Sequence, residues 1–404
     1  MTDPAQDVVV LAAVRTPIGR FLGTLSALPA VDLGVAASRA ALERAGVRPA
    51  DVGLTVFGMA RQAGARPNPA RQVSVRAGVP EEAPAFTINQ ACASGMASLQ
   101  LAADALRAGR AEVVLAGGME SMSQVPHALM RMRNGYRLGA DAVEDLMYRD
   151  GFHCPLADQL MGETAETLAR ERGIPREEQD RFALASQRKA AAAWEAGAFD
   201  AEVVPVEVPG RRGEVVVFDR DEHLRPTTTM ESLAKLPPVF DREHGTVTAG
   251  NASGITDGAA ALVLTTAAVA RRLGARPLAR LLDAEVAGCD PRRMGLGPVP
   301  ATRALLQRRG WSLDDFDLFE LNEAFAAQVL ACLQELPIPE DRLDVHGGAI
   351  ALGHPIGCTG ARIVVTLLHA LARRGGERGL ATLCVSGGMG MTTAWQLLDA
   401  PASA

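Results

Sequence analysis

Residues 42–57, LERAGVRPADVGLTVF, and residues 306–321, LQRRGWSLDDFDLFEL, follow one pattern. Each starts as the end of a helix, reaches a glycine that can end that helix, passes an acidic turn and enters a buried strand. A second matched pair follows in the same order, because 92–119 and 358–389 each run from a cysteine through a helix to an apolar strand ending in GGM. Two matched pairs in one order predict a duplicated α/β fold. The alternative is chance similarity between ordinary strand–helix–strand units.

Short apolar runs alternate with helical patterns in both blocks, which favours parallel sheets with crossover helices. The region between them has no partner in the second half, and helices are expected there around Glu163–Arg172 and Arg176–Ala196. We interpret it as an insertion, where ligand contacts are often found. The predicted domains are a first half (1–121 with 253–276), a loop domain (122–252) and a second half (277–404).

Composition excludes several classes of protein. The chain has 404 residues, 48% hydrophobic and 22% charged, values typical of a globular protein with more than one small core. A net charge of −6 and only two lysines, Lys189 and Lys235, give no surface for nucleic acid. No signal sequence and no uncharged apolar run of about 18 residues is apparent, so we expect a cytoplasmic protein without a membrane span. Six cysteines without a secretion signal do not indicate a disulfide framework.

Cys92 precedes a predicted helix. Apolar residues recur with a helical period from Leu99 to Leu106, and Ser94 is placed to cap this helix. Free N–H groups and the dipole at a helix N-terminus favour a thiolate. Cys92 is therefore a candidate nucleophile, although a packed cysteine at a strand end gives the same pattern.

A second candidate lies in HGGAIALGHPIGCTG, residues 346–360. Pro355 disfavours helical geometry at His354, and the flanking glycines allow close backbone approach, so His354 is expected in a loop. This placement suits a general base or an oxyanion donor, and a structural histidine is the alternative. No metal site is expected, because His346, His354 and Cys358 lack a fourth ligand at any usual zinc spacing.

Two further polar groups follow predicted strands. Cys384 ends the strand Leu380–Val385 ahead of SGGMG, which lacks both the G-x-G-x-x-G spacing and the lysine of a phosphate-binding loop. Its thiol could instead pass a proton between the halves. Asn322 follows another buried strand in a chain with only five asparagines.

Together these motifs resemble the thiolase family, in family order and from about Val8 to Leu398. The matching motifs are the Cys92 segment, GNASG at 250–254, NEAF at 322–325, the loop from Gly347 to Pro355, and Cys384 with its glycines. The resemblance implies a five-layer αβαβα fold of two similar halves with a loop domain over the active site. It also implies reversible Claisen condensation and thiolysis of 3-ketoacyl-CoA.

The resemblance assigns roles to the candidates. Cys92 is the nucleophile, His354 the base that activates it, and Cys384 the acid/base at the α-carbon or the incoming thiol. The enolate oxygen is bound by the ring N–H of His354 and a water held by Asn322. A second oxyanion hole uses the backbone N–H groups of Cys92 and Ser386.

Coenzyme A is implied as substrate and product, with no permanently bound cofactor and no metal. The partners are acetyl-CoA, 3-ketoacyl-CoA and CoA, and the chain is expected to form a homo-oligomer, a dimer or a dimer of dimers. The expected CoA-binding residues are Met161, Arg225, Ser232, Leu233, Ala249 and Ser253 of the first half and loop domain, with Ala324 and Phe325 of the second half. Arg225 is expected to meet the adenosine end, unless it is a solvated turn residue before Pro226.

Three positions depart from the family pattern: His346 replaces an asparagine, Ser386 a glycine, and Leu160 a histidine found in many acetoacetyl-CoA thiolases. Acetoacetyl-CoA is the predicted substrate, and a medium- or long-chain 3-ketoacyl-CoA thiolase is the first alternative. A ketoacyl-synthase-like enzyme is disfavoured by Cys384 and the single catalytic-type histidine. A non-catalytic lipid-binding relative is disfavoured because the chain keeps every chemical group.

Overall fold

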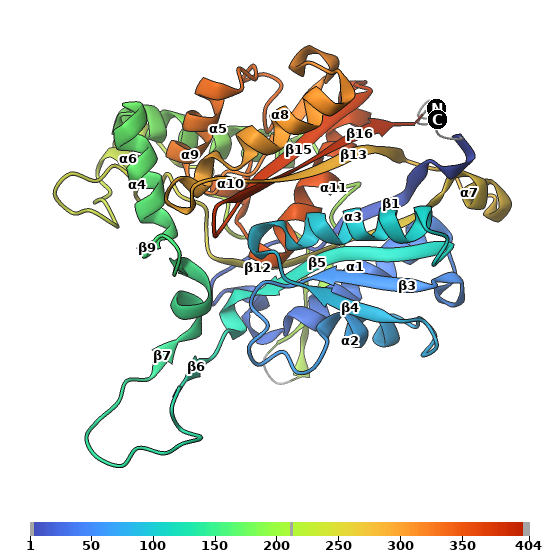
Figure 1. The fold of residues 1–404 in the computed structure, drawn as a ribbon, viewed down its shortest axis with the longest axis horizontal. Helices are drawn as coiled ribbons and strands as arrows, with labels where there is room; N and C mark the ends of the chain where they lie inside the picture. The colour runs from blue at the N-terminus through green and yellow to red at the C-terminus, as the bar shows by residue number, and fades with distance from the viewer. Residues whose placement is uncertain (1–3, 211–212, 399–404) are drawn as a thin grey trace.

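A ten-stranded mixed sheet runs through the protein, seen here in a computed structural model that describes residues 4–210 and 213–398 (Figure 1). Its strands lie in the order β14-β15-β16-β13-β1-β12-β5-β3-β4, and β2 pairs with β12. The strands are β1 (Val8–Arg15), β2 (Gly19–Arg20), β3 (Leu54–Gly58), β4 (Ala85–Ile88), β5 (Val113–Ser121), β12 (Thr256–Thr266), β13 (Ala279–Gly288), β14 (Leu318–Leu321), β15 (Arg378–Val385) and β16 (Met389–Leu397). Residues 1–3, 211–212 and 399–404, included in the predicted first half, loop domain and second half, lie outside the described residues.

The strand order repeats, which confirms the predicted duplication. The first half has the order β1-β12-β5-β3 and the second has β13-β16-β15-β14, with β3 parallel to β5 and β14 parallel to β15. The glycines of the two opening stretches end equivalent helices: Gly46 (φ 63°) follows α1 (Ala30–Ala45), and Gly310 (φ 66°) follows α8 (Pro298–Arg309). Both φ values lie in the left-handed region that glycine adopts without a steric cost.

The expectation of parallel pairing also holds for β3 with β4, but it is wrong for the strands paired with β12 and β16. β12 is antiparallel to both of its main neighbours, β1 and β5, and β16 is antiparallel to β13 and β15. Only the turn Ser386–Gly388 separates β15 from β16, and a connection this short makes a hairpin, whereas a parallel pair needs a long crossover.

Helices form three layers around the two halves of the sheet, which confirms the predicted five-layer arrangement (Figure 1). The central layer contains α3 (Ser94–Arg107) and α11 (Ile356–Arg374), which pack on each other and on strands of both halves. α1 and α2 (Pro69–Arg76) cover the outer face of the first half. α8 and α9 (Ala326–Glu335) cover the outer face of the second.

Both faces of the central strands are buried, as β12 illustrates. Ala260 and Leu262 join the apolar core that contains α3 and α11, whereas Ala261 and Val263 join the core under α1. A strand that is covered on both faces has apolar residues at successive positions. For this reason the sequence of these strands does not alternate between apolar and polar residues. Among the described residues, one helix, α11, is long and apolar enough to cross a membrane, and 83% of its 18-residue apolar window is buried inside the protein.

The region predicted as the loop domain lies between β5 and β12, neighbouring antiparallel strands. Its helices are α4 (Met161–Arg172), α5 (Arg176–Glu195) and α6 (Met230–Ala234). Its described strands form two-stranded pairs outside the main sheet: β6 (His127–Ala128) with β7 (Glu144–Asp145), β8 (His153–Cys154) with β9 (Gln159–Leu160), and β10 (Val206–Pro209) with β11 (Val215–Phe218). The loop between β6 and β7 extends away from the body (Figure 1). Two short helices complete the fold: α7 (Ala267–Leu273) and α10 (Ala349–Leu352).

Candidate active site

Cys92 lies in a 3-10 turn, Ala91–Ala93, directly before α3, as predicted. Ala91 has φ 46°, a left-handed conformation that costs a non-glycine residue about 1–3 kcal/mol. The predicted cap is wrong, because Ser94 is the first residue of α3 and makes no cap hydrogen bond. Its hydroxyl instead accepts from the N–H of Gln90 at 2.9 Å and donates to the carbonyl of Ala91 at 2.7 Å. These bonds hold the strained turn that presents Cys92.

The resting Cys92 is a thiol. Enclosure of its sulfur raises the pKa above the ordinary value, and this outweighs the opposite effects of Arg61 and of the backbone N–H groups of Ser386 and Cys92 itself. The helix N-terminus alone therefore does not supply a thiolate, and a nearby base is required. The N–H groups of Cys92 and Ser386, the pair expected to form an oxyanion hole, both act on this sulfur.

His354 lies in the loop between α10 and α11, as predicted, and is 7% exposed. Its Nδ1 is 2.7 Å from the hydroxyl of Thr359, which donates to the carbonyl of Pro355 at 3.0 Å. Both contacts are satisfied when Nδ1 carries the proton, which leaves Nε2 free to accept one. Burial, followed by the charges of Arg362 and Arg61, lowers the pKa of His354 to about 3, so the ring is neutral.

Cys384 lies near the end of β15 and is 1% exposed. Burial, and next the neighbouring Cys92, raise the pKa of its thiol well above the ordinary value. Cys384 is therefore a thiol at neutral pH and has a proton to give. It packs with Met294 and Ala324, opposite Met161 and Phe325.

One cavity of about 670 Å³ brings these groups together. Cys92 reaches it from the first half, and His354, Cys384 and Ser386 reach it from the second. Asn322 does not line the cavity. Its side-chain nitrogen and oxygen are buried without a hydrogen-bond partner among the described residues, so it needs an intermediary to reach a substrate.

The eight expected CoA-binding residues line this cavity or a second one of about 490 Å³. Those on the first cavity are Met161, Arg225, Ala249, Ser253, Ala324 and Phe325, and those on the second are Arg225, Ser232, Leu233 and Ala249. Arg225 and Ala249 belong to both, together with His223 and Leu224. The two cavities are therefore adjacent and give a long, thin ligand a path toward Cys92.

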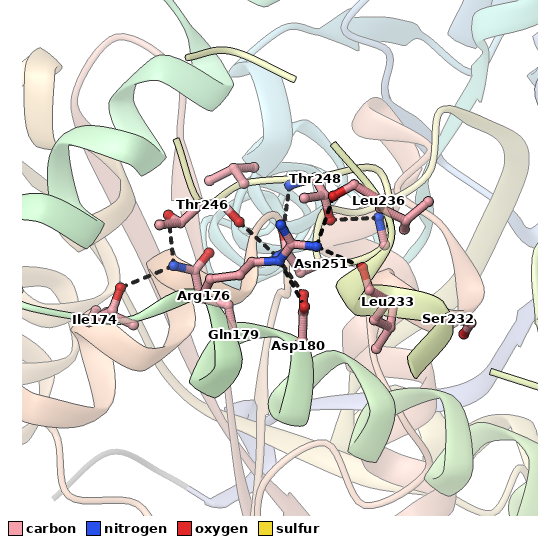
Figure 2. Close-up of polar contacts among 12 residues, drawn as sticks. Ile174, Arg176, Gln179, Asp180, Ser232, Leu233, Leu236, Thr246, Thr248 and Asn251 are labelled. Carbon is pink, nitrogen blue, oxygen red and sulfur yellow. Dashed lines mark hydrogen bonds and ion pairs between the residues drawn. The ribbon is translucent and has the colours of Figure 1, made fainter. Parts of the chain in front are cut away.

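Arg176 on α5 holds the segment that carries Ser232 and Leu233 (Figure 2). Its Nη2 donates to the carbonyls of Leu233 at 2.7 Å and Leu236 at 3.0 Å. Its Nε donates to Oδ2 of Asp180 at 2.7 Å. One partly buried guanidinium thus fixes the end of α6 to α5.

Asp180 continues this network to Asn251, two residues after Ala249 in the sequence (Figure 2). Its Oδ1 accepts from Nδ2 of Asn251 at 2.9 Å, and Nδ2 also donates to the carbonyl of Thr246 at 3.0 Å. Oδ1 of Asn251 accepts from the N–H of Thr248 at 2.8 Å. Hydrogen bonds therefore anchor the cavity wall on both sides of Ala249.

Glu120 joins the two halves beside the site. Its fully buried carboxylate accepts the N–H groups of Ala60 at 3.0 Å, Arg61 at 3.1 Å and Gly357 at 2.8 Å. Gly357 follows the His354 loop and lies against Gly118, where a Cβ would come within 2.1 Å of the Gly357 carbonyl. Only glycine at 118 permits this approach.

Comparisons with known proteins agree with this architecture. Family models for the thiolase N-terminal and C-terminal domains match residues 8–268 and 275–396. The acetyl-CoA acetyltransferase of Cupriavidus necator is 50% identical over 388 residues, which cover 96% of this chain and 98% of that protein. The acetyl-CoA acetyltransferase of Escherichia coli is 50% identical over 392 residues, 97% of this chain and 99% of that protein.

The chain belongs to the thiolase family.

Solved structures extend the likeness along the whole fold. The thiolase superposes on an acetyl-CoA acetyltransferase from Bacillus anthracis with a TM-score of 0.95 and 45% identity, covering 98% of this chain and 100% of that one. Human mitochondrial 3-ketoacyl-CoA thiolase gives a TM-score of 0.94 and 43% identity over 98% and 100% of the two chains. The predicted family and fold are confirmed, and as a thiolase the chain is an acyltransferase.

The three departures have structural accounts. Ser386 is not among the described residues with positive φ, so its backbone accommodates a side chain. His346 is buried against the edge of Phe199, with ring centroids 5.7 Å apart, and burial lowers its pKa. Leu160 adds an apolar side chain to the Cys92 cavity.

Several supporting residues of this thiolase were not assigned a role from the sequence. Glu323 accepts from the hydroxyl of Ser186 at 2.7 Å and from the N–H of Ile350 at 3.0 Å, and so positions the loop that leads to His354. Thr359 and Glu120 also act through backbone or ring contacts. An acidic residue inside a buried motif, as in NEAF, is the signal that could have identified Glu323.

Proposed function

We propose that this thiolase condenses two acetyl-CoA molecules reversibly to acetoacetyl-CoA and CoA, with Cys92 as the nucleophile. The observation that carries the proposal is the convergence of Cys92, His354 and Cys384, from different halves, on one cavity. Two relatives that are 50% identical to this chain are named acetyl-CoA acetyltransferases, which supports acetyl as the acyl group. A medium- or long-chain preference and a non-catalytic lipid-binding role have less support from these names.

Acylation begins with transfer of the Cys92 proton to Nε2 of His354. The thiolate forms a bond with the thioester carbonyl, whose oxygen becomes negative and accepts the N–H groups of Cys92 and Ser386. The bond to CoA breaks, and the departing CoA thiolate takes the proton of Cys384. Cys92 then carries acetyl, His354 is protonated and Cys384 is a thiolate.

Condensation uses those two charged groups. The Cys384 thiolate removes an α-proton from the second acetyl-CoA, and the enolate oxygen accepts from Nε2–H of His354 and a water held by Asn322. The α-carbon bonds to the acetyl carbonyl, the bond to Cys92 breaks, and Cys92 recovers its proton from His354. Thiolysis follows the same steps in reverse.

Coenzyme A acts here as substrate and product, and the eight residues of the two cavities bind it. A cytoplasmic location remains a prediction. A homo-oligomer is supported by two exposed features. β4 is the last strand of the sheet, with Phe86 42% exposed, and the loop between β6 and β7 carries Met132 at 56% and Leu138 at 97%.

The test of the substrate is thiolysis of 3-ketoacyl-CoA esters of increasing length, followed by the loss of enolate absorbance. The highest kcat/KM is expected for acetoacetyl-CoA. A rate that rises steadily to about ten carbons would replace acetoacetyl-CoA by a longer substrate, and no turnover of any ester would refute the enzyme assignment.

A further inference from the structure

Arg61 is a buried cation on the wall of the Cys92 cavity. It follows β3 and is 6% exposed. Its backbone is fixed, because the N–H groups of Ala60 and Arg61 donate to Glu120 and the carbonyl of Ala60 accepts from Nδ2 of Asn89 at 3.1 Å. The guanidinium therefore starts from a rigid point beside the reacting thiol.

The hydrogen-bonding capacity of this guanidinium is largely unused. Its Nε is buried and has no partner, and Nη1 makes one long contact of 3.4 Å to the carbonyl of Ala60. Among residues 4–210 and 213–398 no carboxylate forms an ion pair with Arg61. Its charge acts to lower the pKa of the Glu120 carboxyl, but the Glu120 oxygens accept three backbone N–H groups instead. Burying a guanidinium whose donors lack acceptors is costly, so a hydrogen-bond acceptor from outside the chain would stabilise Arg61.

The surroundings make room for Arg61 but offer its Nε no acceptor among the described residues. Gly151 lies against the guanidinium, where a Cβ would come within 2.3 Å of Nε. The nearby cavity wall is apolar and includes Met122, Phe152 and Ile356. The charge of Arg61 acts on the Cys92 sulfur without a hydrogen bond to it, and both residues line the same cavity.

We propose that Arg61 binds a carboxylate at the far end of the acyl group carried by Cys92, so that this thiolase accepts dicarboxylic acyl groups as well as acetyl. The planar guanidinium matches a carboxylate with two parallel hydrogen bonds. The CoA phosphates are a poorer fit for this site, because Arg61 does not line the second cavity, where Arg225, Ser232 and Leu233 lie. The inference rests on the proposed thiolase reaction and names a further substrate class for it.

Turnover gives the first test. The wild type and Arg61→Met are compared in thiolysis of 3-oxoadipyl-CoA and 3-oxohexanoyl-CoA, which differ only in the terminal carboxylate. The wild type should prefer the carboxylate by about tenfold or more in kcat/KM, and Arg61→Met should abolish the preference. Arg61→Lys should keep part of it, and Gly151→Ala, which displaces the guanidinium without removing its charge, should reduce it. Two results would overturn the proposal. One is a wild-type ratio of the two kcat/KM values near one. The other is an equal loss of kcat/KM on both substrates in Arg61→Met, which is expected if Arg61 only activates Cys92.

Binding gives the second test and does not depend on turnover. Cys92→Ala cannot be acylated, so its affinities for succinyl-CoA and butyryl-CoA can be compared by titration calorimetry. Succinyl-CoA should bind to Cys92→Ala more tightly than butyryl-CoA does, and adding Arg61→Met should remove this difference. That result supports the carboxylate site even if the wild type does not cleave acetoacetyl-CoA. Equal affinities refute the site even if acetoacetyl-CoA is cleaved, so the failure of either proposal is recognised separately.

Discussion

The hydroxyl of Thr359 lies 2.7 Å from Nδ1 of His354 and donates to the Pro355 carbonyl behind it. This arrangement leaves Nε2 free to accept the Cys92 proton in the proposed mechanism. Thr359→Val keeps the shape but lets both tautomers form, and kcat/KM should fall about tenfold with little change in KM. Thr359→Ser is the matched control and should stay near the wild-type rate. Wild-type activity in Thr359→Val would show that the hydroxyl does not select the tautomer.

Cys92→Ser should keep the fold and lose acyl transfer by several orders of magnitude, because a hydroxyl has a far higher pKa than a thiol. Iodoacetamide should label Cys92 before the other cysteines, as read by peptide mass spectrometry. The informative competitor is Cys289, the other cysteine that is not fully buried, whose pKa is raised to about 11 by burial and by Asp290. Labelling that spares Cys92 in active enzyme at neutral pH contradicts its assignment as nucleophile.

Cys384→Ala should separate the two halves of the reaction. Acetyl-CoA should still acetylate Cys92, more slowly, whereas condensation and thiolysis should fall much further because no group removes the α-proton. Mass spectrometry of quenched mixtures measures the acetylated fraction. Near-normal condensation would make Cys384 a packing residue, and a complete lack of acetylation would show that its two proton transfers cannot be separated.

Arg176→Gln should weaken acetyl-CoA binding through the segment that carries Ser232 and Leu233. The carbonyls of Leu233 and Leu236 would lose their shared donor, so KM should rise several-fold while kcat changes little. Arg181→Gln, on the same helix but with a side chain 71% exposed, is the control and should match the wild type in steady-state kinetics. An unchanged KM in Arg176→Gln would show that this contact does not position the CoA site.

The unfolding free energy should fall on the acid side because of His354. Its pKa is about 3 in the folded protein and about 6.5 when unfolded, so between these values the unfolded chain binds a proton that the folded protein excludes. Above pH 6.5 the His354 ring is neutral in both states and does not lower the unfolding free energy. As the pH falls from 6.5 toward 3, the unfolding free energy decreases by up to about 1.4 kcal/mol per pH unit. Urea unfolding at several pH values measures the unfolding free energy as a function of pH. Between pH 3 and 6.5 this free energy should change less steeply with pH in His354→Asn than in the wild type. Identical slopes would mean that His354 titrates normally.

The sequence predicted the repeated architecture because the repeated units leave local signals. The helix-ending glycines Gly46 and Gly310 and the apolar strands after them can be read without tertiary information. Strand direction could not be read in this way, because β12 and β16 look the same whether they run parallel or antiparallel to their neighbours. Only the shortness of the Ser386–Gly388 turn indicates a hairpin in the second half.

The sequence singled out Cys92, His354 and Cys384 because the proposed chemistry requires those residue types, and the structure brings all three to one cavity. Residues whose role depends on contacts with distant parts of the sequence could not be predicted. Arg61 and Glu120 are 59 residues apart, and a lone charge in each local segment is indistinguishable from a surface residue. Ser94 is an error in the other direction, because a role was assigned to it that the structure does not show. Serine is well suited to cap a helix, but the Ser94 hydroxyl instead bonds the backbone of the turn before α3.

The region predicted as the loop domain occupies the position that a three-residue turn fills in the other half. It leaves β5 and returns in β12, strands that pair directly from Ser121 opposite Asp257. Both attachment points therefore lie side by side, and the sheets are unchanged by what the connection contains. Evolution can lengthen, shorten or exchange the cover of the cavity at this one connection, and so alter which acyl groups are admitted, without disturbing the cores that hold the reacting thiols.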